Sequence, residues 1–248
     1  MPMDTKNVRF YHGTDSKSAL SIISSGYKDV LADLGADKFA AELWTRLVEL
    51  RSEHVLTRIL GSSGANVVAA LRSLSSGLFC YADCCATPNP AVAYGHTLAN
   101  RFRSERLLVI SEAMDELRYV SHADAERIAS NYPSVIRRIN EQPGHPVVIE
   151  LHGIEAHRLR TKRGSPDIDD SMNSFFEAEY DYERPYGGSF RIADVTPTDI
   201  VAVHDLSGWT VDDLPSPLYL TSSRMAPVRS TVRDWLSRAR CGSPRSMR

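Results

Sequence analysis

Cysteine is scarce in this sequence, which has four in 248 residues: Cys80, Cys84, Cys85 and Cys241. No pair has the C-x-x-C spacing that is typical of zinc or redox sites. Cys84 and Cys85 are adjacent, so their thiols cannot readily join in a disulfide of ordinary geometry. We therefore expect reduced thiols, and a protein of a reducing compartment.

Long hydrophobic runs and an excess of one charge are also missing. No apolar stretch reaches the roughly 18 residues of a membrane-spanning helix, and the first residues, MPMDTKNVRF, lack the apolar centre of a signal peptide. The 29 basic and 31 acidic residues give a formal charge of −2, so no global positive field favours nucleic acid. We expect a cytoplasmic protein without membrane or nucleic-acid partners, in which the basic stretch RLRTKRG at 158–164 is an exposed loop.

The hydrophobic pattern predicts both helices and strands. Aromatic residues at 10–12 favour a strand that Gly13 ends, which would put His12 at the strand end, before a helix over 16–25. Periodic apolar residues predict a helical block near 27–76 and further helices over 91–102 and 111–139, the last broken at Pro133. A basic amphipathic helix is predicted from residue 228. Strands are predicted over 78–82, 106–110, 145–154, 189–195 and 199–206, with a loop over 83–90.

This order of segments predicts a mixed α+β fold whose sheet is split into two packed halves around a cleft. The composition, 42% hydrophobic and 24% charged, is that of an ordinary globular chain. We expect a single domain over 1–240, with a helical insertion at about 27–76, followed by a flexible tail over 241–248.

Three segments in order carry a family resemblance: YHGT at 11–14, GLFCYADCCATPNPAVAYG at 77–95, and EAEYDYERPYGGSFRIADVTPTDIVAV at 177–203. Together they resemble the ADP-ribosyltransferase superfamily, in its His-Tyr-Glu branch of poly(ADP-ribose) polymerases and diphtheria-like toxins. The first segment is similar to the family's His-Gly-Ser/Thr opening, and the second to its GIYFA…A..Y segment. The resemblance covers about a third of the chain and implies the family's split β-sheet core.

The resemblance implies a site for NAD. His12 would hydrogen-bond the ribose hydroxyl on the nicotinamide side, and Gly13, followed by Thr14, would let the backbone approach the carboxamide. Tyr94 would stack on the nicotinamide ring. Two structural alternatives stay open, namely that a backbone carbonyl caps His12 and that Tyr94 is a helix residue facing the core.

The family's first tyrosine aligns with Tyr81 by its distance from the following Ala-Asp pair, or with Phe79 by its distance from Gly77. We prefer Tyr81, because a phenol can brace the ribose or carboxamide as well as stack on a ring. Core packing remains an alternative for both side chains.

The family's glutamate usually opens the strand that corresponds here to FRIADV, but this chain has Gly-Gly-Ser before that strand. Upstream, Glu177 and Glu179 have the E-x-E spacing of protein-modifying toxins, in which the first glutamate serves the acceptor and the second contacts the ribose. We choose Glu179 as the catalytic carboxylate, then Glu177, with Glu183 as a third register. A solvated acidic loop is the alternative.

The implied activity is NAD-dependent mono-ADP-ribosylation of a protein side chain, with release of nicotinamide. NAD would be the substrate and no metal would be needed. A compact transferase with a helical insertion resembles bacterial toxins and effectors, delivered into a host cell by a secretion system without a cleavable signal peptide. The acceptor would then be a host protein, for example ubiquitin or a GTPase.

Three other functions stay open. The first is an NAD-dependent RNA 2'-phosphotransferase or a nucleic-acid ADP-ribosyltransferase. The second is a catalytically inactive transferase fold that serves as a binding module. The third is a hydrolase that uses Cys80 or Cys84 with His12 or His96.

Overall fold

The chain forms two compact units that alternate along the sequence. Unit 1 comprises Met1–Lys28, Asp83–Ala99 and Pro143–Arg248, and unit 2 comprises Asp29–Ala82 and Asn100–Gln142. The computed structural model describes residues 5–50, 68–72, 83–100, 102, 104–161, 190–214 and 228–241. None of the helices in these ranges is long and apolar enough to cross a membrane.

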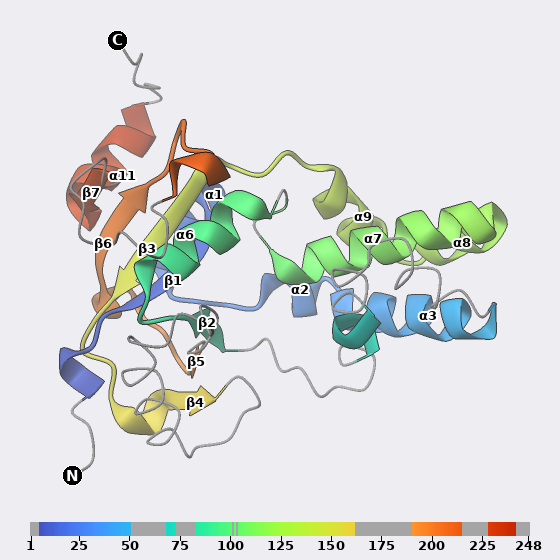
Figure 1. Cartoon of the computed structure of the whole chain (residues 1–248), viewed down its shortest axis with the longest axis horizontal. Helices are drawn as coiled ribbons and strands as arrows, with labels where there is room; N and C mark the ends of the chain where they lie inside the picture. Colours follow the sequence, from blue (N-terminus) through green and yellow to red (C-terminus); the bar gives the residue numbers. More distant parts are fainter. Residues whose placement is uncertain are drawn as a thin grey trace. The chain divides into compact units, whose positions relative to one another are not determined.

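Unit 1 contains a four-stranded antiparallel sheet in the order β1-β3-β6-β7 (Figure 1). Its strands are β1 (Phe10–Asp15), β3 (Pro146–Leu151), β6 (Ile200–Asp205) and β7 (Val228–Thr231). Every residue of β3 is buried, which explains the continuous apolar run and confirms the strand predicted near 145–154. The strand predicted over 199–206 is likewise confirmed as β6.

A second, three-stranded antiparallel sheet has the order β2-β5-β4. Its strands are β2 (Cys84–Ala86), β5 (Phe190–Ile192) and β4 (Leu159–Thr161). A bridge joins the two sheets, because the amide of Tyr11 donates to the carbonyl of Thr87 at 2.7 Å and the amide of Thr87 donates back at 3.1 Å. The described residues therefore combine helices with two antiparallel sheets, which confirms the prediction of a mixed α+β fold.

Three helices cover the four-stranded sheet: α1 (Ser16–Ser25), α6 (Pro90–Ala99) and α11 (Val232–Cys241). Asp15 caps α1 by accepting from the amides of Lys17 and Ser18, so the helix predicted over 16–25 is confirmed. Ile22 and Trp235 place α1 and α11 on one face of the sheet, in a core with Phe10, Ile149 and Val203. Tyr94 of α6 packs on the other face, and Figure 1 shows α6 in front of β1 and β3.

Short 3-10 turns connect several of these elements: η1 (Thr5–Asn7), η2 (Ala156–Arg158), η4 (Pro197–Asp199) and η5 (Val211–Asp213). The turn η4 lies between β5 and β6, where the sequence places Thr196 and Pro197 between two strands. Its N-terminus is closed by a capping box, in which Thr196 and Asp199 bond each other's backbone.

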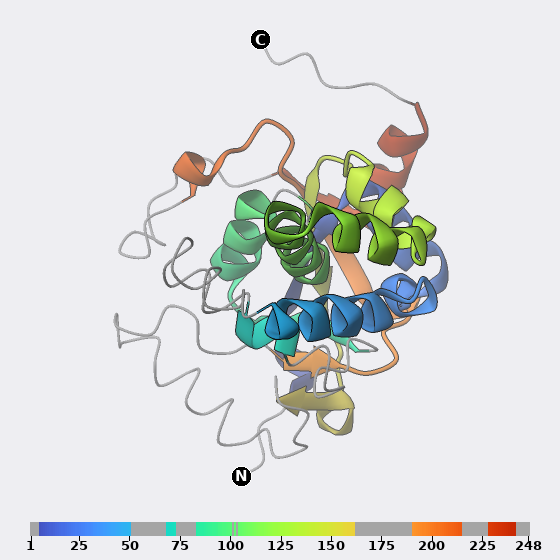
Figure 2. The same ribbon diagram turned by 90° about the vertical axis from the view of Figure 1, so that its right-hand side faces the viewer.

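Unit 2 is helical in its described residues. It contains α2 (Val30–Asp33), α3 (Ala36–Glu49), α7 (Glu105–Val120), α8 (His122–Ser130) and α9 (Pro133–Asn140), with residues 68–72 also helical. Figures 1 and 2 both show α3 beside α7, and Phe39, Leu43, Ile110 and Leu117 share one buried core. Of the helical block predicted near 27–76, the described residues contain α2, α3 and the helical residues 68–72, while 51–67 and 73–76 lie outside the described residues. The helices predicted over 111–139 are found in this unit, and Pro133 begins α9 as the predicted break requires.

Some predicted boundaries are wrong. Residues 106–110 belong to α7 rather than to a strand, because Ser104 caps the helix and the buried Leu107, Ile110 and Met114 repeat at helical spacing. Arg106 in the same run pairs with Asp29 at 2.8 Å. Residues 84–86 form β2 instead of loop, and β7 precedes α11 where one helix was predicted, because both short segments find strand partners far away in the sequence.

Candidate functional site

His12 is the third residue of β1, paired with Ile149, and not the end of the strand as predicted. Its Nδ1 atom lies 2.7 Å from the carbonyl oxygen of Cys85, close to the bridge between the two sheets. The ring of Tyr27 stands edge-on to the imidazole, with 5.6 Å between ring centroids. A backbone carbonyl therefore caps His12, and the side chain is fixed while part of it stays exposed.

The surroundings of His12 favour a neutral imidazole. Burial lowers its pKa more than the bond to the Cys85 carbonyl raises it. A carbonyl only accepts, so we assign the proton to Nδ1, which leaves Nε2 as an acceptor. At neutral pH the side chain can orient a hydroxyl group without adding positive charge.

Gly13 continues β1 instead of ending it, paired with Val148. A Cβ atom at this position would lie 2.0 Å from Oγ1 of Thr97 and 2.9 Å from the carbonyl oxygen of Ala93, both on α6. The glycine therefore lets α6 pack closely against the strand. The next residue, Thr14, is buried and 5% exposed.

Tyr94 faces the core from α6 and is 8% exposed. Its hydroxyl lies 2.9 Å from Nδ1 of His204 on β6. The ring of Tyr11 also contacts His204, and successive residues of a strand point to opposite faces, so His12 points away from Tyr94. Of the predicted site, the structure brings Gly13 and Tyr94 to one face of the sheet and places His12 on the other.

Several predicted site residues lie outside the described residues: Phe79, Tyr81, Glu177, Glu179 and Glu183, as do the strand predicted over 78–82 and most of the tail over 241–248. Cys84 and Cys85 form no disulfide. Cys84 is 1% exposed, and burial raises the pKa of its thiol well above the usual value. A buried protonated thiol is a weak nucleophile, which disfavours a hydrolase based on Cys84.

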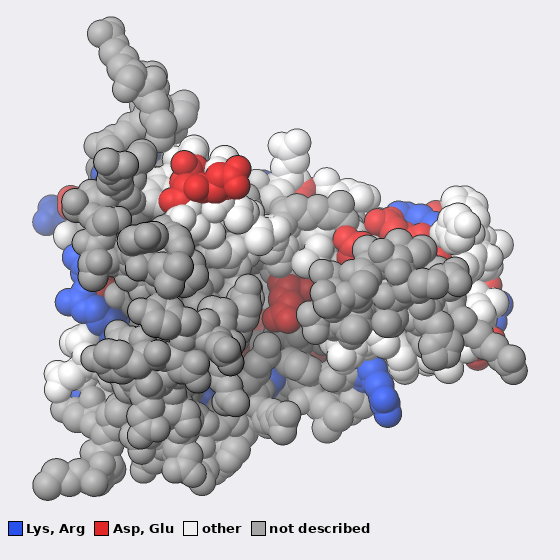
Figure 3. Space-filling model, viewed as in Figure 1, with Lys and Arg blue, Asp and Glu red and all other residues white. Residues whose placement is uncertain are grey.

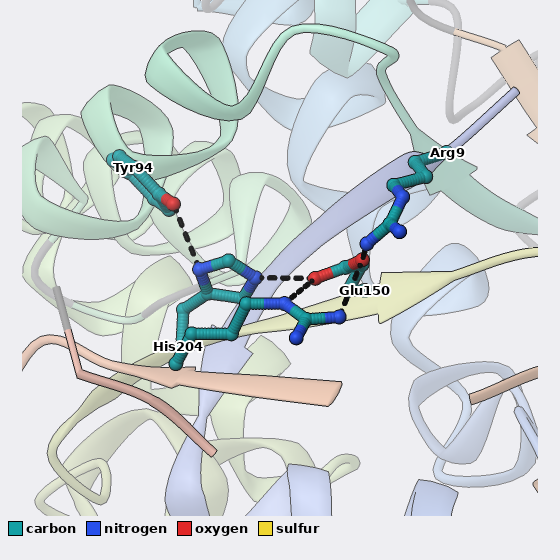
Figure 4. A network of polar contacts seen from close by, with 5 residues as sticks. Arg9, Tyr94, Glu150 and His204 are labelled. Atoms are coloured by element: carbon teal, nitrogen blue, oxygen red, sulfur yellow. Dashed lines mark hydrogen bonds and ion pairs between the residues drawn. The ribbon is translucent and has the colours of Figure 1, made fainter. Parts of the chain in front are cut away.

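The sequence reasoning missed a buried polar network centred on Glu150 of β3, whose side chain is 1% exposed (Figure 4). Its Oε2 accepts from Nε2 of His204 at 2.9 Å and from Nε of Arg229 at 2.7 Å. Its Oε1 accepts from Nη2 of Arg229 at 3.1 Å and from Nη1 of Arg9. The available signal was a glutamate inside the apolar run PVVIEL and a histidine inside IVAVHD.

The network has a defined protonation state. Burial alone would raise the pKa of Glu150, but hydrogen bonds from Arg229, His204 and Arg9 outweigh it and lower the pKa to about 2. Burial lowers the pKa of His204, and Nε2 must carry the proton that it donates to the carboxylate. Nδ1 then accepts from Tyr94, whose own pKa is raised by burial. The result is a neutral histidine between a phenol and a carboxylate.

Comparisons with protein-family models, with curated proteins and with solved structures find no match for this chain. Among the described residues, no group of three or more His, Cys, Asp or Glu side chains is arranged to hold a metal ion.

Proposed function

We propose that the protein is an NAD-dependent mono-ADP-ribosyltransferase that transfers ADP-ribose to a protein side chain and releases nicotinamide. The observation that carries the proposal is His12, within the motif YHGT, with Nδ1 held by the Cys85 carbonyl and Nε2 left as an acceptor. An acceptor in a fixed orientation is what the ribose hydroxyl of NAD needs.

In the proposed reaction His12 orients the ribose hydroxyl, and two glutamates act on the nucleophile and on the transition state. The acceptor nucleophile forms a bond to C1' of the ribose, the bond from C1' to the nicotinamide nitrogen breaks, and nicotinamide leaves as a neutral molecule. The proton of the nucleophile passes to a base, for which Glu177 is our candidate. Positive charge develops on the ribose, so a carboxylate such as Glu179 would stabilise the transition state.

The neutral state of His12 suits this chemistry. A cationic imidazole next to the ribose would repel the positive charge that develops at C1' and would raise the barrier. The lowered pKa of His12 avoids this repulsion at neutral pH. Tyr27, edge-on to His12, closes one side of the imidazole.

The remaining parts of the proposal follow from the resemblance. The two antiparallel sheets would take the family's arrangement around a cleft, with Tyr81 or Phe79 against the nicotinamide. The stacking role predicted for Tyr94 is not kept, because Tyr94 is buried on the face of the sheet opposite His12. The acceptor would be a host protein, such as ubiquitin or a GTPase, and the protein would act as a bacterial effector. NAD would serve as the substrate, without a metal.

Nicotinamide release from NAD tests the proposal, together with intact-mass measurement of candidate acceptor proteins. We expect release by the wild type, and a loss of at least roughly tenfold in NAD affinity and turnover for His12→Ala, since an orienting hydrogen bond is removed. His157→Ala is the matched control, because His157 is 73% exposed and contacts Glu155 on the surface.

Three outcomes would count against this proposal or against the role it gives to His12. NAD binding without nicotinamide release would favour an inactive binding module. Release that requires RNA with a 2'-phosphate would favour the RNA phosphotransferase. Equal activity of His12→Ala and His157→Ala would mean that His12 serves only the structure.

A further inference from the structure

The network around Glu150 carries more positive than negative charge. Glu150 is ionised, and Arg9 and Arg229 both donate to it, while His204 is neutral because burial lowers its pKa. Two guanidinium groups thus share a single carboxylate. Among the described residues that contact this carboxylate, one positive charge is left without a counter-charge.

The two arginines reach Glu150 from opposite edges of the sheet. Arg9 directly precedes β1 at one edge, and Arg229 lies in β7 at the other edge, two strands away from β3. Neighbouring strands are about 4.8 Å apart, so the Arg229 side chain must cross β6 to meet Glu150. Both arginines contact the same Oε1 atom, which holds the two guanidinium groups side by side.

Glu150 uses only part of each guanidinium. Each of its oxygens accepts two hydrogen bonds, which fills the lone pairs of the carboxylate. Most of the N–H groups of Arg9 and Arg229 are directed elsewhere, and the two side chains are 51% and 49% exposed. Figure 3 shows Lys and Arg side chains at the left edge of the view, where β6, β7 and α11 lie in Figure 1.

We propose that Arg9 and Arg229 form a binding site for a phosphate group, either free phosphate or the phosphate monoester of a small molecule. A tetrahedral anion offers oxygens to two guanidinium forks at once, and its negative charge is opposite in sign to the excess at the site. Glu150 orders both arginines before the ligand arrives, so little side-chain entropy is lost on binding. Tyr11, paired with Glu150 across β1 and β3, borders the site on the same face.

This site is separate from the proposed NAD chemistry. Arg9, Glu150 and Arg229 share the face of the sheet that carries Tyr11 and Tyr94, while His12 points to the other face. The phosphate proposal therefore does not depend on nicotinamide release, and either proposal can fail alone.

Isothermal titration calorimetry of the whole chain, in a chloride buffer of constant ionic strength, tests the site. Inorganic phosphate and glycerol 3-phosphate, which shares no base or ribose with NAD, are the probes, and we expect a dissociation constant below about 1 mM for at least one of them. Equal binding of the two would identify free phosphate as sufficient, and tighter binding of glycerol 3-phosphate would indicate a phosphate monoester. No binding of either probe at millimolar concentration would overturn the proposal.

A matched pair of variants separates specific recognition from general charge. Arg9→Gln should weaken binding of the better probe by at least tenfold, while Arg233→Gln, which removes the same charge from an exposed position of α11, should leave it within twofold. If Arg9→Gln does not fold, Arg9→Lys retains the charge beside Glu150 but loses the planar fork, and should also weaken binding. Equal effects of the Arg9 and Arg233 variants would refute a built site.

Discussion

The hydroxyl of Tyr94 and the Nδ1 atom of His204 lie 2.9 Å apart, which ties helix α6 to strand β6 within the core. Because Nε2 of His204 donates to Glu150, Nδ1 can only accept, and Tyr94 is its donor among the described residues. Removal of this hydroxyl would leave a buried acceptor without that bond.

Tyr94→Phe is therefore expected to lower the free energy of unfolding by about 1–3 kcal/mol, the usual cost of a buried unpaired polar group. Urea unfolding followed by circular dichroism measures the change. Tyr119→Phe is the control, because Tyr119 is 81% exposed, and it should shift stability by less than about 0.5 kcal/mol. A Tyr94→Phe protein as stable as the wild type would contradict the assigned hydrogen bond.

Gly13→Ala should destabilise the protein by about 1–3 kcal/mol, because the new Cβ would overlap Thr97 and approach the backbone of Ala93. Gly95→Ala, in the middle of helix α6, should be neutral or stabilising by up to about 1 kcal/mol, since its Cβ would meet only Leu214, at 3.7 Å. Thermal unfolding of the two variants in parallel is the measurement. Similar effects of the two substitutions would argue against close packing of α6 on β1.

Glu150 predicts a specific acid dependence of stability. The pKa of Glu150 is lowered to about 2 in the folded protein, whereas in the unfolded chain it is about 4.3. The contribution of Glu150 to the free energy of unfolding is therefore present above the unfolded pKa and is lost as the pH falls toward 2. The difference between the folded and unfolded pKa values corresponds to about 3 kcal/mol of unfolding free energy. Urea unfolding between pH 7 and pH 3 should show a smaller loss of stability for Glu150→Gln than for the wild type.

Asp212→Asn is the control for this measurement, because it removes the same charge from an exposed turn. Its dependence on pH should follow that of the wild type. If Glu150→Gln and the wild type lose stability in parallel, the carboxylate is not the group that responds to acid.

Substitution of the three glutamates in EAEYDYE tests whether the protein is an active enzyme or an inactive fold. Glu179→Gln keeps the shape of the side chain but loses its charge, so turnover of NAD should fall by roughly a hundredfold or more, with NAD affinity retained. Glu177→Gln should spare slow NAD hydrolysis and reduce transfer to the acceptor. Nicotinamide release and acceptor mass shift, measured side by side, distinguish these effects.

Glu183→Gln tests whether the family's glutamate is aligned with the correct residue of this chain. If it alone abolishes both activities, the catalytic carboxylate is four residues further along the chain than proposed. If none of the three substitutions matters, the carboxylate mechanism does not apply to this protein.

The sequence pattern predicted the elements whose caps, breaks and buried residues all lie within one short stretch of the chain. Helix α1 has its cap at Asp15 and its buried Ile22 and Ile23 within one short stretch, and β3 is a buried run bounded by Pro146. The run at 106–110 is ambiguous, because a short apolar segment fits a buried strand or a helix equally well. Its helical state depends on the packing of α7 against α3.

The sites depended on contacts that no local pattern contains. Gly13 stays within a strand because α6 packs over it, and the capping of His12 comes from Cys85, 73 residues away. Glu150 meets Arg9 and Arg229 at separations of 141 and 79 residues. A charged residue inside an apolar strand signals that partners exist but does not identify them.

The alternation of the two units constrains how the protein can be made. The chain passes between the units after Lys28, Ala82, Ala99 and Gln142, so neither unit corresponds to an uninterrupted fragment. During translation, β1 cannot pair until β3 has been synthesised. The arginine of β7 can reach Glu150 only when nearly all of the described chain has left the ribosome. Closing such distant pairs makes folding slow and leaves early strands unpaired. Nascent chains halted before residue 228 should therefore be more sensitive to protease than the finished protein.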